Sequence, residues 1–343
     1  MAKATIDDVA ELAGVSIKTV SRVVNREPNV REATREKVNK AIAKLKYTPS
    51  LSARSLASQR SHLMVLVYDD PSVYRVPSEG YIVRLQQGAL RACHAYGCEL
   101  LIHPCRIREK NVGAELKALI EKLRPDGMIL AAPLSQMPKV IRPISSTGTP
   151  FVRLSPGTSN GKQLSVVTND RDICAEMTSY LISLGHTRIA FIKGDPQHKA
   201  VAKRFLGYTD GLLASGLKVN ESLIEAGDNS IGSGEACAST LLARKSPPTA
   251  IFAANDDMAA GVIRVADRLG FDIPGHLSVA GFDDSALAQQ IYPALTTIHQ
   301  PLAAMAERAT LALIANSGAT ASSGAEVVPA TIQIRESTGP APR

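Results

Sequence analysis

The chain has 343 residues, of which 45% are hydrophobic and 21% charged, and this composition excludes an intrinsically disordered protein. The length is sufficient for a small domain attached to a larger body with its own core. Residues 1–62 hold 12 Lys and Arg against 6 Asp and Glu, whereas residues 63–343 hold 27 against 26. The net charge of +7 is therefore concentrated in the first fifth of the chain, which favours a polyanion-binding segment on a nearly neutral body.

The sequence argues against export and membrane insertion. The start MAKATIDD has no apolar signal core, and no apolar run reaches membrane-spanning length. The five cysteines are odd in number and lack paired metal-ligand spacing, so reduced buried thiols in the cytoplasm explain them best. The alternative is that the first two, spaced as Cys-x4-Cys, form a redox pair. The five are Cys93, Cys98, Cys105, Cys174 and Cys237. We expect a cytoplasmic protein with no cofactor and no metal.

Residues 5–25, TIDDVAELAGVSIKTVSRVVN, predict two short helices joined by a tight turn at Gly14. Thr5 is an N-cap with Asp8 at the capping-box position, and Ser16 caps the second helix. A third helix is expected from about Glu32 to Leu45. The expected inward-facing residues are Val9, Leu12 and Ala13 in the first helix, Val20, Val23 and Val24 in the second, and Thr34, Val38, Ala41, Ile42 and Leu45 in the third.

The outer face of the second helix carries the chemistry needed to read a DNA major groove. Arg22 can make a bidentate contact with guanine, Ile17 can pack on a thymine methyl group, and Lys18 can reach guanine or a phosphate. Short hydroxyl side chains there are suited to holding phosphates. The candidate DNA contacts of this segment are Thr5, Ser16, Ile17, Lys18, Thr19, Ser21, Arg22 and Asn25. The alternative interpretations are a plain helical hairpin and, for Lys18, a solvated surface lysine.

This stretch resembles the DNA-binding head of the lactose-repressor (LacI/GalR) family. The resemblance implies that the positions of Ile17, Lys18 and Arg22 carry most of the operator choice. The following segment, residues 49–61, begins with Pro49-Ser50, which ends the third helix and caps a helix too short to be stable alone. Leu56 is similar in position to the family's leucine wedge, which enters the minor groove and kinks DNA, and Arg54 can follow the phosphate backbone. The alternative is an ordinary linker with Leu56 packed on the core.

From residue 62 onward, apolar strand-like runs alternate with helix-like stretches, a pattern typical of parallel sheets covered on both faces. The expected strands are Met64–Tyr68, Cys98–Pro104, Gly127–Ala131, Phe151–Leu154, Arg188–Gly194, Thr249–Asn255 and Ser278–Asp284, with early helices near Val83–Tyr96 and Ala114–Leu123. Two such series predict two doubly wound lobes, with a ligand cleft between them at the strand ends.

Polar residues follow several of these strands, where they can converge on that cleft. They are Asp69 and Asp70, Asn255 and Asp256, Asp283 and Asp284, and Arg204 beyond the strand that ends at Gly194. Carboxylates, an amide and a guanidinium group together can hydrogen-bond the vicinal hydroxyls of a sugar-like ligand. Individually, an Asp after a strand is more often a helix cap.

The resemblance to the LacI/GalR family extends over nearly the whole chain, through SLGHTRIAFI, RFLGYTDGL, AANDDMAAGV, IPGHLSVAGFDDS and YPALTTIHQP in the family's order. It implies effector contacts at Arg204, Asn255, Asp283 and Gln300, with Asp69 and Ser155 as weaker assignments and Phe282 lining the same cleft. Asn169-Asp170 and Asn229 depart from the family pattern, the latter at a position where a member has an aromatic. These departures concern which sugar is bound and not the presence of a cleft. Tyr74, Tyr81 and Tyr292 could supply an aromatic ring instead.

These observations predict an all-α helix-turn-helix head and an α/β body of two doubly wound parallel-sheet lobes, similar to periplasmic binding proteins. The expected domains are the head at 1–48, the hinge at 49–61 and the core at 62–343, with the first lobe at 62–166 and 298–326 and the second at 167–297 and 327–338. The C-terminal segment AEVVPATIQIRESTGPAPR is expected to form one final strand and a loose tail, without coiled-coil heptads.

The resemblance implies a homodimeric transcriptional regulator that binds palindromic operator DNA and no membrane. We expect a repressor of carbohydrate-use genes, released by a sugar-like inducer. A regulator activated by a purine-like or nucleoside-like corepressor is the alternative, and a soluble sugar-binding protein without a DNA role is a second one. The chain has no GxGxxG after a strand, no P-loop, no HExxH and no GxSxG, so the sequence does not favour an enzyme.

Overall fold

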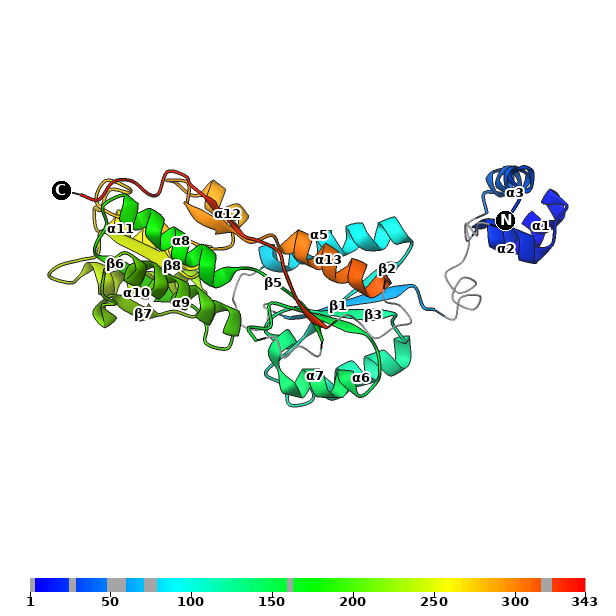
Figure 1. The fold of residues 1–343 in the computed structure, drawn as a ribbon, viewed down its shortest axis with the longest axis horizontal. Helices are drawn as coiled ribbons and strands as arrows, with labels where there is room; N and C mark the ends of the chain where they lie inside the picture. The colour runs from blue at the N-terminus through cyan, green and yellow to red at the C-terminus, as the bar shows by residue number, and fades with distance from the viewer. Residues whose placement is uncertain are drawn as a thin grey trace. The chain divides into compact units, whose positions relative to one another are not determined.

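The computed structural model describes residues 4–24, 29–47, 60–70, 79–158, 163–315 and 323–342. Two compact units make up the chain, residues 1–62 and residues 63–343 (Figure 1). The predicted DNA contacts Asn25, Arg54 and Leu56 lie outside the described residues.

The N-terminal unit contains α1 (Ile6–Ala13), α2 (Ile17–Val24) and α3 (Glu32–Leu45), as the sequence predicted. Val9, Val20 and Val38, one from each helix, are fully buried and form its small core. The prediction for Leu12 was wrong, because this side chain is 44% exposed and Ala10 is buried in its place. At about 100° per residue, Leu12 lies on the other side of Val9 from Ala10 and therefore turns away from the core.

The first lobe of the larger unit is built on a six-stranded sheet in which all neighbouring strands are parallel, in the order β11-β5-β4-β3-β1-β2. Its elements are β1 (Leu63–Asp69), α5 (Glu79–Tyr96), β2 (Glu99–Cys105), α6 (Val112–Leu123), β3 (Gly127–Leu130), η2 (Leu134–Gln136), α7 (Pro138–Ser145), β4 (Phe151–Leu154), β5 (Leu164–Val167), α13 (Leu302–Ala315) and β11 (Gly324–Val327).

Helices cover both faces of this sheet (Figure 1). Alternate residues of β1 point to opposite sides: Met64 and Leu66 pack with α5 and α13, while Val65 and Val67 pack with α6 and α7. Helices α5 and α13 cross so closely at Gly88 that a Cβ there would lie 1.8 Å from the Ala303 carbonyl oxygen. This close packing fixes α5 against α13.

The second lobe has a four-stranded parallel sheet in the order β7-β6-β8-β9 and a separate antiparallel pair, β10-β12. Its elements are α8 (Asp170–Ser183), β6 (Ile189–Lys193), α9 (Lys199–Ala214), η3 (Glu221–Leu223), β7 (Ile224–Ala226), α10 (Ile231–Leu242), β8 (Ala250–Ala253), α11 (Asp256–Arg268), β9 (Ser278–Ala280), α12 (Ala286–Gln290), β10 (Thr297–His299) and β12 (Thr331–Gln333). The chain therefore passes between the lobes after β5, after β10 and after β11. The two doubly wound lobes predicted from sequence are present.

The prediction for the C-terminal segment was wrong in two respects. It forms two strands, β11 and β12, which belong to sheets in different lobes. The tail is also anchored, since the Ala341 N–H donates to the Leu184 carbonyl at 2.8 Å and Ser337 is fully buried. Pro329 separates the two strands, and a proline that cannot donate to a ladder is a natural place for the chain to leave the first sheet.

None of the helices in the described ranges combines the length and apolar character needed to cross a membrane. All five cysteines lie in the described ranges and none forms a disulfide; Cys98 is partly accessible and the other four are buried.

Candidate DNA-reading helix and ligand cavity

Side-chain caps fix the two helices of the predicted DNA-reading segment. The Thr5 Oγ1 accepts the Asp8 N–H at 3.3 Å while the Asp8 carboxylate accepts the Thr5 N–H at 2.7 Å, which completes the predicted capping box. The Thr5 N–H and the Thr5 hydroxyl, which both donate to the Asp8 carboxylate, lower the pKa of Asp8, because they stabilise its ionised form. Gly14 adopts a φ of 65° in the turn, and the Ser16 Oγ accepts the Thr19 N–H at 3.2 Å.

The exposed residues of α2 are the ones that the sequence assigned to DNA. Val20 and Val23 are buried against the other two helices, whereas Ile17, Lys18 and Arg22 are exposed, Ile17 to 47%. Thr19 and Ser21 are half-buried beside them. A single exposed isoleucine is ordinary on a protein surface, but its combination with two cations on one helix matches the chemistry of a major-groove base edge.

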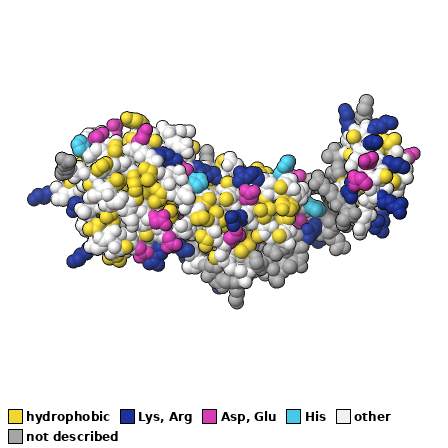
Figure 2. All heavy atoms as spheres, turned by 45° about the horizontal axis from the view of Figure 1, so that its top comes forward, with side chains coloured by type: hydrophobic (Ala, Val, Ile, Leu, Met, Phe, Trp, Pro, Cys, Tyr) yellow, Lys and Arg dark blue, Asp and Glu magenta, His cyan; other side chains and the backbone are white. Residues whose placement is uncertain are grey.

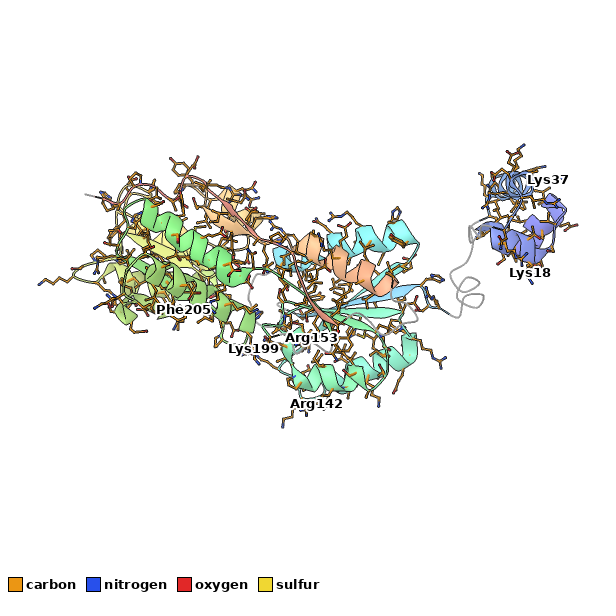
Figure 3. The ribbon with its side chains drawn as sticks, in the orientation of Figure 1. Lys18, Lys37, Arg142, Arg153, Lys199 and Phe205 are labelled. Atoms are coloured by element: carbon orange, nitrogen blue, oxygen red, sulfur yellow. The ribbon has the colours of Figure 1, made fainter. Side chains whose placement is uncertain are left out.

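Lys and Arg side chains are spread over the visible surface of the N-terminal unit, with some Asp and Glu side chains among them (Figure 2). Figure 3 shows that they come from more than one element, with Lys18 on α2 and Lys37 on α3. Such a surface favours binding to a polyanion through many phosphate contacts.

A cavity of about 280 Å³ lies in the larger unit, lined by residues from both lobes. Six of the eight predicted effector contacts line it: Asp69, Ser155, Arg204, Asn255, Asp283 and Gln300. Asp69 and Ser155 come from the ends of β1 and β4 in the first lobe, and Asn255 follows β8 in the second. The rule that parallel strands direct their carboxyl ends to one edge predicted four of these six, Asp69, Arg204, Asn255 and Asp283, whereas Ser155 and Gln300 came only from the family resemblance.

Arg204 and Asp283 form an ion pair in the lining of the cavity. The Arg204 Nη2 lies 3.6 Å from the Asp283 Oδ1, its Nη1 donates to the Ala254 carbonyl, and its guanidinium lies 3.5 Å from the centroid of the Phe282 ring. Arg204 is only 6% exposed, so its orientation is fixed by these contacts before any ligand arrives. A fixed guanidinium beside a carboxylate offers donors and an acceptor to adjacent hydroxyl groups.

Three buried polar atoms on lining residues lack a hydrogen-bond partner: the Ser155 Oγ, the Arg204 Nε and the Gln300 Oε1. A buried polar atom without a partner is unfavourable, and the great majority in proteins are satisfied. Ser155 also adopts a φ of 45°, in the left-handed region that a non-glycine residue seldom occupies. Unsatisfied atoms and an unfavourable backbone at one cavity are the features expected of a ligand site.

Burial raises the pKa of two lining carboxyl groups to about 6, those of Asp69 and Asp283. For Asp283 the neighbouring guanidinium of Arg204 acts in the opposite direction, because it stabilises the carboxylate. The Asp69 carboxylate also accepts the Ile107 N–H at 3.1 Å. Both groups are therefore ionised acceptors at neutral pH and become protonated in mildly acidic solution.

The other two predicted effector contacts lie elsewhere. Phe282 is fully buried behind Arg204 and does not line the cavity, and its position therefore contradicts that part of the prediction. Asp70 is also absent from the lining, and its N–H continues the pairing of β1 with β2 through a 2.7 Å bond to the Cys105 carbonyl. Asn255 lines the cavity and at the same time caps α11, since its Oδ1 accepts the Met258 N–H at 3.0 Å.

Several lining residues were missed or left unplaced by the sequence analysis. Asp195 follows β6, so the strand-end rule could have predicted it. Tyr81 at the start of α5 and Arg108 after β2 have no sequence pattern that marks them as lining residues. Tyr81 supplies an aromatic ring to the lining, which Asn229, with its φ of 72°, does not. The additional polar or aromatic lining residues are Tyr81, Arg108, Asp195, Gln197, His198, Asp228 and Asn229. Among the described residues no group of His, Cys, Asp or Glu is arranged to hold a metal ion.

An exposed helix with the side chains predicted to read bases on one unit, and a cavity with unsatisfied polar atoms in the other, are the features expected of a DNA-binding regulator that responds to a small molecule. Comparison with known proteins agrees with this class. The model "Bacterial regulatory proteins, lacI family" matches residues 5–50, and the "Periplasmic binding protein-like domain" model matches residues 178–338. The HTH-type transcriptional regulator GalR of Escherichia coli (strain K12) is 34% identical over 316 residues, which cover 89% of this chain and 87% of GalR.

Two solved structures extend the likeness over the whole chain. The Lac repressor dimer bound to operator and the anti-inducer ONPF is 26% identical, with a TM-score of 0.80 and coverage of 98% of this chain and 100% of that one. The complex of the transcriptional regulator CelR with cellobiose is 29% identical, with a TM-score of 0.74 and coverage of 97% and 99%. The chain belongs to the LacI family of bacterial regulatory proteins, and it is a DNA-binding transcriptional regulator.

Proposed function

We propose that this regulator is a homodimeric cytoplasmic repressor of carbohydrate-use genes, released from a palindromic operator by a neutral sugar. The observation that carries the proposal is the cavity between the lobes, where three unsatisfied polar atoms and two ionised carboxylates meet. Hydroxyl groups, which both donate and accept hydrogen bonds, satisfy such a set better than a purely apolar ligand does. No catalysed reaction forms part of the proposal.

The size of the cavity favours a small sugar. Its 280 Å³ lies at the lower limit of the range of about 300–1,000 Å³ that is usual for ligand sites. Tyr81 provides one ring for the apolar face of a sugar, and the polar side chains of Arg204, Asp283, Asn255 and Gln300 surround the other groups. The sugar-bound relative CelR supports this ligand class.

On DNA, we assign base reading to Ile17, Lys18 and Arg22 of each protomer. Ser16, Thr19, Ser21 and Thr5 are assigned to phosphates, where they set the register of α2 in the groove. One reading helix covers half of a site, so two copies are needed for a palindrome. The operator-bound dimer of the related Lac repressor supports this arrangement. The segment 49–61, with Arg54 and the Leu56 wedge, is proposed to order on the operator between the two half-sites.

The two activities are coupled if effector binding changes how the lobes are oriented and, through the dimer, how the two heads are spaced. Coupling of this kind is reciprocal, so operator DNA must change the effector affinity by the same factor as the effector changes the operator affinity. Titrations with and without operator that gave identical effector affinities would exclude the coupling.

The test begins with selection of bound sequences from a random DNA pool by the purified full-length protein. The selected duplex is then used in a screen of neutral sugars, including cellobiose and D-ribose, for release. We expect an enriched palindrome that a sugar releases. Enrichment that a purine or nucleoside strengthens would reverse the sign of the response, and absence of any enriched sequence would overturn the assignment of α2.

A further inference from the structure

We infer that Arg84, on α5 of the first lobe, is a positioning residue for Asp283 of the second lobe. In this arrangement Asp283 is correctly placed for an effector only when the first lobe is close enough for Arg84 to reach it. The inference rests on the proposed function of the cavity, and it identifies a side chain that makes the state of the site depend on the lobe arrangement.

The contacts of Arg84 carry the inference. Its Nη1 donates to the Asp283 carbonyl oxygen at 3.0 Å, and its Nη2 donates to the carbonyl oxygen of Asp284. Both bonds join residues about 200 positions apart, from an element of the first lobe to the loop after β9 in the second. The planar guanidinium suits two neighbouring carbonyls, whereas a lysine ammonium is a single point charge and cannot reproduce this geometry.

The loop held by Arg84 has an unfavourable backbone. Asp283 has a φ of 117° and Asp284 a φ of 52°, both in the region that favours glycine. The second lobe fixes Asp284 by itself, since Arg335 and His299 bind its carboxylate at 2.5 Å and 2.9 Å. The carbonyls, by contrast, take their side-chain donors from the first lobe. Loss of Arg84 therefore removes the side-chain donor to the Asp283 carbonyl, and the backbone at Asp283 is then held from the second lobe alone.

Arg84 also influences the charge on the Asp283 side chain. The charged and titratable groups around Asp283 are Arg84 and Tyr81 from α5, Arg204 from α9, Asp170 from α8, Asp256 and Asp257 from α11, and the adjacent Asp284 with its partners His299 and Arg335. Burial raises the pKa of Asp283, and the guanidinium groups of Arg204 and Arg84 counteract this. Removal of Arg84 therefore moves the protonation of Asp283 to higher pH.

The helix offers a matched control. Arg91 lies two turns further along α5 and pairs with Glu307 at 3.1 Å, inside the first lobe, with 57% of its side chain exposed. Arg91→Met removes a guanidinium from the same helix without touching Asp283. An exposed pair of this kind contributes little to stability.

The first measurement uses amide hydrogen exchange of the full-length protein without sugar, in wild type, Arg84→Met, Arg84→Lys and Arg91→Met. The Asp283 and Ser285 N–H groups donate to the Ile298 carbonyl and the Asp256 carboxylate at 2.9 Å and 2.7 Å, so their exchange reports how well the loop is held. In Arg84→Met we expect exchange at 283–285 to be at least about tenfold faster, with α5 unchanged. Arg84→Lys should recover part of the protection, and Arg91→Met should match wild type. Unchanged exchange at 283–285, or equal acceleration throughout α5, would overturn the inference.

The second measurement uses calorimetric titration with cellobiose and with D-ribose from pH 5 to pH 8. Wild-type affinity should fall as the pH drops below about 6, where Asp283 and Asp69 become protonated. In Arg84→Met the midpoint should move to higher pH, while Arg91→Met leaves it in place; an unmoved midpoint contradicts the role of Arg84. If the wild type binds neither probe, the failure concerns the proposed ligand class, and the exchange experiment still decides the role of Arg84.

Discussion

Replacement of Asp283 by Asn tests the effector site with almost no change in side-chain volume. Asp283→Asn removes the negative charge and replaces one carboxylate oxygen, an acceptor, by an amide nitrogen, a donor. It also removes the negative charge that faces the Arg204 Nη2 at 3.6 Å. We expect the substitution to weaken effector binding strongly and to leave operator binding in the absence of effector unchanged.

The magnitude follows from the kind of bond that is lost. A hydrogen bond to a charged group contributes about 1.5–3 kcal/mol, which corresponds to a loss of affinity of about 10- to 150-fold. The effect on the free energy of unfolding should be smaller, because two changes oppose each other. Neutralisation removes a carboxylate whose burial is unfavourable, while Arg204 loses one partner but keeps the nearby carboxyl group of Asp170.

Two titrations on the full-length protein measure the outcome. Calorimetry gives the affinity for the sugar that releases the wild type, and fluorescence anisotropy gives the affinity for the operator. Asp210→Asn is the matched control, because Asp210 is exposed, pairs with Arg171 on the surface and lies outside the cavity lining. Effector affinity in Asp283→Asn within twofold of wild type would refute the assignment of Asp283, and a loss shared with Asp210→Asn would point to a general effect of lowering the acidic charge.

Three further predictions concern the reading helix, the small core and pH. Arg22→Ala should reduce the preference for operator over random DNA by about 1–3 kcal/mol in anisotropy titrations. As a control, Lys37→Ala on α3 should lower the affinities for operator and for random DNA equally or leave both unchanged. Retained specificity in Arg22→Ala would contradict a base contact. Val38→Ala should destabilise the N-terminal unit by about 2–3 kcal/mol, because Val38 is fully buried. In circular-dichroism melting, only the transition temperature of this unit should fall. Val83→Ala, at a 46% exposed site, should change the transition temperatures little. Because the folded-state pKa values of Asp69 and Asp283, about 6, exceed the ordinary 3.8, the folded body binds more protons between these values. Its melting temperature without sugar should therefore fall as the pH rises from 4 through 6, while the stabilisation by added sugar increases; a melting temperature independent of pH in this window would contradict the burial of these carboxyl groups.

Local signals predicted most of the N-terminal unit. Thr5, Asp8, Gly14 and Ser16 act within one helical turn of their own positions, so their roles are visible in the sequence. Leu12 shows the limit of such reasoning: in an eight-residue helix several apolar faces are consistent with the pattern, and the packing of the three helices selects Ala10.

The strand-end rule found residues on both sides of the cavity, because all neighbouring strands within each main sheet are parallel and their carboxyl ends share an edge. It could not separate a residue that faces the cavity from one that continues the sheet. Asp69 and Asp70 differ by one position, and the alternation along a strand sends only the first into the lining. Phe282 was misplaced for a related reason, since its neighbour Asp283 occupies the cavity and the ring turns to the opposite side, beneath Arg204.

Residues that act between the lobes had no local signal. In the sequence, Arg84 is one more arginine on an amphipathic helix, indistinguishable from Arg91, because its partners lie about 200 residues away. Arg84 differs from Arg91 only because the second lobe lies within its reach. A ligand that binds both lobes and a side chain that crosses between them stabilise the same arrangement, so each strengthens the other. A substitution at Arg84 should therefore weaken effector binding and also change how operator binding responds to the effector. A substitution that only removes a ligand contact should lower the effector affinity and leave the lobe equilibrium of the free protein unchanged.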